Sequence, residues 1–111
     1  MIRAANKAAM RYIFDGGLVV DLLGARMIEG EKVVKLTAIE VTILSQLLAN
    51  KWTKPKALAT RLFGTVIPGA DYNNLRVRIS WLRRKLDTFD TCVLIEVDRR
   101  LGYRIVEEGE E

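Results

Sequence analysis

Short apolar runs separated by turn residues fill the first third of the chain. Several strands of this length at this spacing predict a small antiparallel sheet over residues 11–36. The expected strands are RYIF, LVVDLL, ARMI and VVKL, and the turns between them are Asp15-Gly16-Gly17, Gly24 and Glu29-Gly30-Glu31-Lys32. Residues 1–10 are alanine-rich and fit a helical turn as well as a loose tail, so we set them apart as an N-terminal tail.

A helical period begins after Leu36. Thr37 and Glu40 fit a capping box, in which the threonine oxygen and the glutamate carboxylate each accept a free backbone N–H. Apolar residues then recur every four positions, which predicts a helix to about Asn50. They are Ile39, Ile43 and Leu47, with Leu44 and Leu48 widening the stripe.

Two further helices and a hairpin are expected after Asn50. The second helix has Thr53 as its N-cap and Pro55 in its first turn, and it ends at Gly64. The segment TVIPGADYNN is expected to form a loop, and Asp71 within it can cap a third helix, which is placed over residues 72–86. VLIEV and YRIV then predict two strands joined by DRRLG. The expected fold is α+β: an N-terminal antiparallel sheet, three helices and a C-terminal β-hairpin within residues 11–106, with residues 107–111 as an acidic tail.

The composition argues against an enzyme. Histidine is absent, which removes the commonest general base and metal ligand, and neither common glycine-rich phosphate loop occurs. Cys92 is the only cysteine, and its place in CVLIEV predicts a buried strand residue. We therefore expect no catalytic residue, no metal and no cofactor. No apolar run approaches the roughly 20 residues of a membrane span and no secretory signal is present, so we expect a cytoplasmic protein.

The charge is unevenly distributed along the chain. The net charge is +4, but residues 1–106 hold all 18 basic residues and only ten of the 14 acidic ones, which gives them a net charge of +8. A basic body indicates an anionic partner, with nucleic acid as the first candidate and a membrane surface or an acidic protein behind it.

The third predicted helix separates its residues into faces. Four leucines and isoleucines fall within about 40° of one another and predict a buried stripe. They are Leu75, Ile79, Leu82 and Leu86. The residues that point away from this stripe are Asn73, Val77, Ser80 and Arg84, with Trp81 beside them. The cations on the two flanks are Arg76 and Arg83 on one side and Arg78 and Lys85 on the other.

This arrangement is typical of a helix that enters the DNA major groove. Flanking arginines would reach phosphates on both groove walls, while Val77 suits a thymine methyl and Asn73 suits adenine. A merely solvated surface helix is the alternative. Such helices usually mix charge signs, because like charges four residues apart repel, and residues 72–86 contain no Asp or Glu. Trp81 has three interpretations: it contacts or inserts into DNA, it docks a protein partner, or it folds back onto the hairpin as core.

From about Tyr12 to Val106 the chain resembles the OmpR/PhoB-type winged-helix domain, the DNA-binding effector half of many two-component response regulators. The residues that carry the resemblance are Leu36-Thr37-x-x-Glu40 with Ile43-Leu44, then Val77-x-Ile79-Ser80-x-Leu82-Arg83-Arg84-Lys85-Leu86, then Gly102-Tyr103-Arg104. The resemblance implies a winged helix-turn-helix, with recognition helix 72–86 in the major groove and a wing over residues 98–102 in the minor groove. It assigns mainly structural roles to Glu40, Ile79, Leu82 and Tyr103.

The resemblance also implies partners and a binding site. The partners are double-stranded DNA, a second copy of the chain on head-to-tail direct repeats, and RNA polymerase or another transcription protein through the loop before the recognition helix. The expected DNA-binding residues lie on the third helix, at the start of the second helix and in the wing. They are Thr53, Lys54, Asn73, Asn74, Arg76, Val77, Arg78, Ser80, Trp81, Arg83, Arg84, Arg99 and Arg100.

The chain departs from the family at several of these positions. Asn73 stands where members usually carry a phosphate-binding arginine, Arg76 where they often carry an acidic residue, and Trp81 where they carry a basic or polar one. In the wing, Arg100 replaces a usual glycine. No receiver domain precedes the winged helix, which fits either a stand-alone regulator of the kind that a phage or mobile element encodes or a fragment of a longer protein.

The leading hypothesis is a sequence-specific double-stranded DNA-binding transcription regulator without an enzymatic step. The alternative is a protein-interaction module that has lost specific DNA binding, such as a phage-encoded inhibitor of RNA polymerase or of a host regulator. Asn73 and Trp81 motivate this alternative. A third hypothesis is autoinhibition, in which residues 107–111 lie over the basic face.

Overall fold

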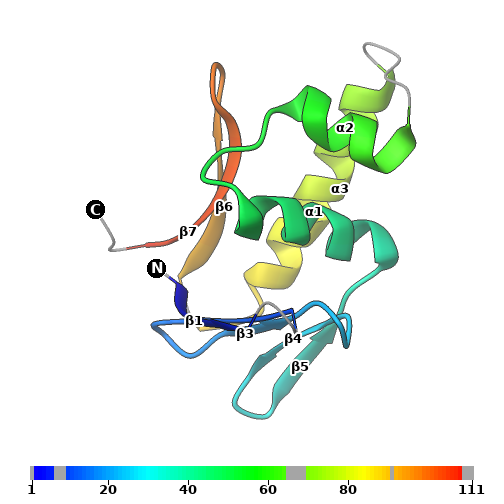
Figure 1. Cartoon of the computed structure of the whole chain (residues 1–111). Coiled ribbons are helices and arrows are strands. Elements are labelled where there is room, and N and C mark those ends of the chain that lie inside the picture. The colour runs from blue at the N-terminus through cyan, green and yellow to red at the C-terminus, as the bar shows by residue number, and fades with distance from the viewer. Residues whose placement is uncertain (1, 7–9, 65–69, 91, 109–111) are drawn as a thin grey trace.

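Two sheets and three helices make up the computed structural model, which describes residues 2–6, 10–64, 70–90 and 92–108. The strands of the first sheet are β1 (Ile2–Asn6), β2 (Arg11–Phe14), β3 (Val19–Asp21), β4 (Arg26–Glu29) and β5 (Lys32–Lys35). The helices are α1 (Ala38–Ala49), α2 (Pro55–Phe63) and α3 (Ala70–Leu86), and the C-terminal hairpin is β6 (Val93–Asp98) and β7 (Gly102–Glu107). Figure 1 shows the first sheet on one side of the helices, with the hairpin standing beside them. The predicted α+β winged helix-turn-helix is confirmed.

The N-terminal sheet is antiparallel throughout, in the order β1-β2-β3-β4-β5. The strands β2 to β5 follow the predicted runs. The interpretation of residues 1–10 as a tail was wrong for residues 2–6, which pair with β2 as the edge strand β1. Alanine is depleted in strands, so the composition of this segment does not predict a strand. The strand forms because the backbone N–H and C=O groups along the edge of β2 pair with those of residues 2–6.

The capping box at the start of α1 is confirmed. The Glu40 N–H donates to Thr37 Oγ1 at 3.2 Å, and the Thr37 N–H donates to Glu40 Oε1 at 2.7 Å. The same carboxylate oxygen accepts from Lys85 Nζ of α3 at 2.6 Å, although the Glu40 side chain is only 4% exposed. Glu40 therefore joins the start of α1 to the end of α3, in agreement with the structural role that was expected of it.

Both later helices begin at residues other than those predicted. The N-cap of α2 is Lys54 rather than Thr53, because Thr53 is drawn into an antiparallel bridge with Tyr103. Asp71 lies in the first turn of α3, which starts at Ala70, so it is not the cap residue that was predicted. It still places a negative charge near the helix N-terminus, where the helix dipole favours one.

The hairpin is anchored to the segment between α1 and α2. The Thr53 N–H donates to the Tyr103 carbonyl and the Tyr103 N–H donates to the Thr53 carbonyl, both at 2.8 Å. Gly102 makes this close approach possible, because its backbone φ is +102° and an added Cβ would lie 2.7 Å from the carbonyl carbon of Thr53. The position of the wing relative to the helices thus depends on one glycine and two backbone hydrogen bonds.

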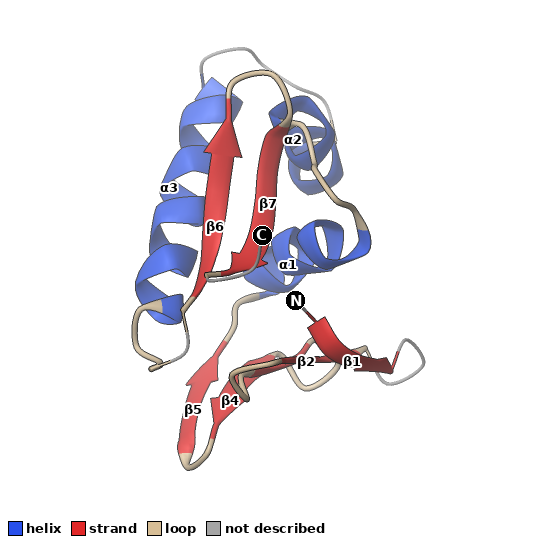
Figure 2. Ribbon diagram, turned by 90° about the vertical axis from the view of Figure 1, so that its left-hand side faces the viewer, coloured by secondary structure: helices blue, strands red, loops and turns tan. Residues whose placement is uncertain are grey.

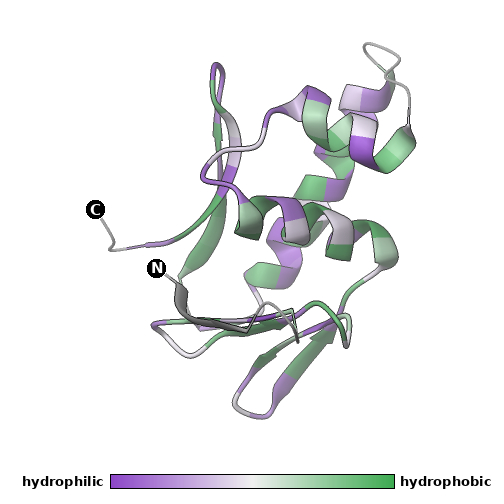
Figure 3. Cartoon of the chain, viewed as in Figure 1, coloured by the Kyte–Doolittle hydropathy of each residue, from purple (hydrophilic) through white to green (hydrophobic). Residues whose placement is uncertain are grey.

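One apolar core joins the sheet, the helices and the hairpin. It includes Phe14 and Met27 from the sheet, Leu44 from α1 and Leu82 from α3. Figure 3 shows hydrophobic and hydrophilic segments alternating along α3, as expected for a helix that buries one side.

The prediction of a buried Cys92 was wrong: the residue is exposed and precedes β6.

Glu107 was assigned to the acidic tail, but it ends β7 and is only 8% exposed. Its two carboxylate oxygens accept from the N–H groups of Asp15 and Gly16 at 2.9 and 2.7 Å. The end of the hairpin is thereby tied to the β2–β3 turn. Residues 109–111 lie outside the described part of the chain, so the autoinhibition hypothesis is untested.

The buried Asp21 makes the stability of the N-terminal sheet depend on pH. Its carboxylate accepts from the Gly24 N–H at 3.0 Å and from Arg26 Nε at 3.2 Å. The Gly24 N–H, and after it Arg26, lower the pKa of Asp21 below its ordinary value of 3.8, although burial acts in the opposite direction. Because the folded pKa is lowered, the stabilisation is complete above pH 3.8 and is lost as the pH falls through the folded value.

We expect Asp21→Asn to destabilise the fold near neutral pH and to have a smaller effect as the pH falls below about 4. The measurement is the free energy of unfolding in urea from pH 2.5 to 7 for both proteins. A difference between them that stays constant over that range would rule out the carboxylate as the source.

Candidate nucleic-acid interface

The faces of α3 are those that the sequence predicted. Leu75, Ile79, Leu82 and Leu86 are all buried. From Asn73 to the end of the helix, the exposed residues are Asn73, Asn74, Arg76, Val77, Ser80, Trp81 and Arg84, and we call them the outer face of α3. Figure 2 shows α3 beside β6, with β7 on the other side of β6. This leaves the outer face as the surface that a groove-binding helix needs.

Trp81 is exposed at the surface, with 49% of its area accessible. The interpretation in which it folds back onto the hairpin as core was therefore wrong. The guanidinium carbon of Arg78 lies 5.3 Å from the centroid of the Trp81 ring, within the range of a cation–π contact. Trp81 and Arg78 thus form a pair one helical turn apart on the flank of α3 opposite Arg76.

Arg76 and Asn73 form a second pair. Arg76 Nη1 donates to Asn73 Oδ1 at 3.0 Å, and both residues are exposed. The Asn73 amide, which the sequence analysis matched to adenine, is thereby oriented by a cation before any DNA arrives. Asn73 and Arg76 are two of the positions that depart from the family pattern, and the hydrogen bond joins their side chains.

Two of the flanking cations turn inward. Arg83 donates to the Ile95 carbonyl of β6 from Nε at 3.2 Å and from Nη2 at 3.0 Å. Lys85 donates to the Lys35 carbonyl at 2.8 Å and forms the ion pair with Glu40. Arg83 and Lys85 therefore fasten α3 to its neighbours, and neither is a clean probe of DNA contact.

A groove of about 460 Å³ lies between α3, the start of α2 and the wing. Five cations line it, from three separate elements: Lys54, Lys56, Arg76, Arg99 and Arg100. The one carboxylate there, Asp98, accepts from the N–H groups of Arg100 at 2.8 Å and Leu101 at 3.0 Å. These hydrogen bonds, Leu101 first, lower the pKa of Asp98 and fix the turn that carries Arg99 and Arg100. The groove thus presents cations on a turn whose shape is set by its own aspartate.

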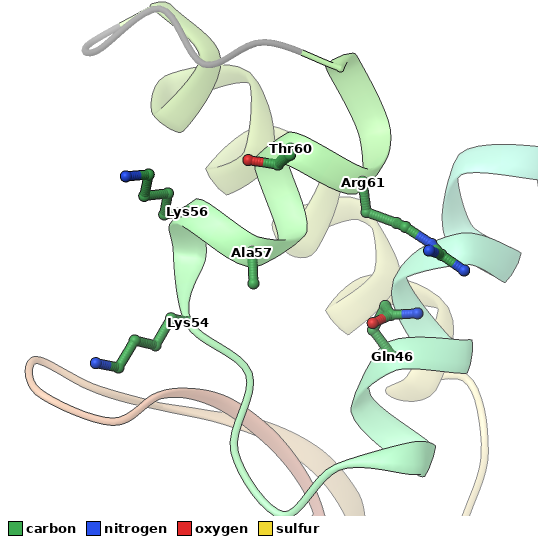
Figure 4. Close-up of a pocket in the computed structure, with 6 residues that line it drawn as sticks. All are labelled: Gln46, Lys54, Lys56, Ala57, Thr60 and Arg61. Carbon is green, nitrogen blue, oxygen red and sulfur yellow. The ribbon is translucent and has the colours of Figure 1, made fainter.

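A shallower hollow of about 700 Å³ continues the basic surface over α2 and the end of α1. Figure 4 shows Lys54 and Lys56 extending on one side of α2, with Arg61 and Gln46 on the other. Sequence reasoning missed Lys56 and Arg61. Lys56 could have been found, because it follows Pro55 in the first turn of a helix whose N-terminus was already assigned to DNA.

Thr53 does not belong to this surface. It is 5% exposed, and its hydroxyl donates to the Gln46 carbonyl at 3.3 Å. Its side chain therefore does not make the phosphate contact that was expected of it, because the bridge to Tyr103 turns the residue inward.

The described residues contain no group of three or more metal-ligating side chains. Within the same residues, no helix is long and apolar enough to cross a membrane.

The comparison with protein families shows to which family this chain belongs. The profile described as "Transcriptional regulatory protein, C terminal" matches residues 30–105, about two thirds of the chain. The chain belongs to this family. It is the OmpR/PhoB-type family of DNA-binding transcriptional regulators, whose domain carries no catalytic activity. A comparison with curated proteins finds no match.

Membership of the OmpR/PhoB-type family bears on the sequence predictions in different ways. The matched segment runs from Gly30, in the turn before β5, to Ile105 within β7, so it includes α3 and the residues that line the cationic groove. DNA binding follows from it as the function of the family. An origin in a phage or mobile element does not follow from it.

Proposed function

We propose that this chain is a sequence-specific regulator that places the outer face of α3 in the major groove of double-stranded DNA and its wing in the adjacent minor groove. The observation that carries the proposal is the convergence of five cations from α2, α3 and the wing on one groove beside an exposed helix face. Cations that converge from separate elements suit a continuous polyanion better than they suit solvent alone.

The roles within the interface divide by chemistry. Lys54, Lys56 and Arg84 provide phosphate contacts, which position the protein without reading sequence. Val77 and Ser80, at the centre of the outer face, meet base edges. Arg99 and Arg100 enter the minor groove, whose negative potential attracts arginine. Arg83, which is bound to β6, supports the interface from behind.

Salt dependence tests this proposal. With about six phosphates neutralised, the logarithm of the binding constant should fall with the logarithm of salt concentration with a slope of about −5. The double substitution Arg99→Ala and Arg100→Ala should reduce that slope by about 2. Lys35→Ala is the matched control, because its exposed side chain lies on the N-terminal sheet. Equal effects of the control and the wing variant would contradict the proposal.

A protein-interaction module is the second candidate function. The specific observation that favours it is the pair of exposed apolar residues on the outer face, Trp81 at 49% and Val77 at 47%. Exposed tryptophan is common in binding hot spots. Such an interface would tolerate salt, whereas DNA binding would weaken steeply as salt rises.

Assembly and location complete the proposal. Two copies bind head to tail on direct repeats, and the protein acts in the cytoplasm. Contact with RNA polymerase is proposed for the loop before α3, most of which, residues 65–69, lies outside the described part of the chain. Titrating the protein onto duplexes with one and with two half-sites tests the paired arrangement, which predicts tighter binding to the second duplex.

A further inference from the structure

The Arg78–Trp81 pair is not explained by a role in folding. Trp81 is 49% exposed, so about half of its surface is open to solvent and does not contribute to the core. The Arg78 side chain forms no hydrogen bond or ion pair with another described residue, in contrast to the side chains of Arg76, Arg83 and Lys85 on the same helix. The guanidinium of Arg78 instead contacts the ring of Trp81.

The Nε atom of Arg78 shows how the side chain is held. This atom is fully buried and has no hydrogen-bond partner among the described residues. An unpaired buried donor is unfavourable and is tolerated when the arrangement serves another contact. The cation–π contact with Trp81 offsets part of that cost and restricts an otherwise flexible side chain. The guanidinium is thus pre-oriented, with its terminal nitrogens as the donors that remain for a ligand.

We propose that Trp81 is a positioning residue that holds Arg78 for a bidentate contact with a guanine in the major groove. The inference rests on the proposed DNA-binding function. Guanine presents two acceptors, O6 and N7, side by side in the major groove, and a planar guanidinium matches them. Stacking against an aromatic ring leaves the guanidinium edge free for this contact, since the ring occupies only its face. Trp81 therefore acts through Arg78 and does not itself read a base.

The test is a selection of duplexes from a random library with the wild-type protein, followed by affinity measurements on its best site and on each single-base substitution of that site. Arg78→Lys keeps the charge but removes the planar guanidinium that makes the bidentate contact. It should reduce the preference for guanine at one position by about tenfold. Trp81→Leu keeps apolar bulk but removes the ring, and it should reduce the preference at that same position by about two- to fivefold. Trp81→Phe should restore most of the preference.

Arg11→Lys is the matched control, since Arg11 is exposed on β2 of the N-terminal sheet, outside the proposed interface. It should leave every base preference unchanged. Circular dichroism of each variant serves as the folding control, and we expect every variant to be folded because the substituted side chains are partly exposed. The inference is overturned if Arg78→Lys and Trp81→Leu affect different base pairs, if only a thymine preference changes, or if neither variant changes a guanine preference. If the wild-type protein selects no sequence at all, the proposed function fails instead, and the two failures are distinct.

Discussion

We expect Gly102→Ala to destabilise the protein by about 3–5 kcal/mol, a large part of the total stability of a small domain. The backbone φ of +102° disfavours any residue with a Cβ. The added Cβ would also overlap the Thr53 carbonyl group, so the two backbone hydrogen bonds between Thr53 and Tyr103 would have to break. The measurement is the free energy of unfolding in urea, with DNA affinity measured on whatever folded protein remains.

Gly17→Ala is a matched control for this experiment. Gly17 has the same φ of +102°, but an added Cβ would meet nothing within 4 Å. It should therefore cost only the backbone strain, about 1–2 kcal/mol. The difference between the two variants isolates the close approach of the wing to Thr53. If both substitutions cost the same, that approach would not stabilise the wing.

The second large effect is expected from Glu40→Ala, at about 3 kcal/mol. The substitution removes the acceptor of the Thr37 N–H and leaves Lys85 without its buried partner. The Lys85 side chain is 29% exposed, which lets it recover some hydration and keeps the cost below that of a fully buried charge. Urea unfolding again provides the measurement.

Thr37→Ala separates the two roles of Glu40. It removes the reciprocal half of the capping box and leaves the Glu40–Lys85 ion pair in place, so it should cost about 1 kcal/mol. A cost for Glu40→Ala no larger than that of Thr37→Ala would mean that the link to α3 contributes nothing to stability.

The elements with strong periodicity could be predicted from the sequence. The four-residue recurrence from Ile39 and the capping box of Thr37 and Glu40 indicated α1, because local hydrogen bonding and a single buried face determine both. The same holds for the buried stripe of α3. The family signature added the order of the elements and the assignment of the hairpin as a wing.

The features that could not be predicted depend on contacts between distant segments. Residues 2–6 form a strand because the edge of β2 accepts them, and Thr53 turns inward because Tyr103 pairs with it. Glu107 looked like part of a solvated tail, yet it binds the backbone of a turn 91 residues away. Within the site, spacing placed Arg83 on the DNA side, but the Ile95 carbonyl holds it. Local patterns carry no information on such long-range partners.

The most direct test of the central claim, that the outer face of α3 and the wing bind DNA in a sequence-specific manner, is a selection of duplexes from a random library with the winners measured at two salt concentrations. We predict one shared motif, repeated about one helical turn apart, and binding that weakens steeply as salt rises. If no motif is enriched and only weak binding remains, lost at physiological salt, the central claim is contradicted, and the exposed Trp81 becomes the centre of a protein interface instead.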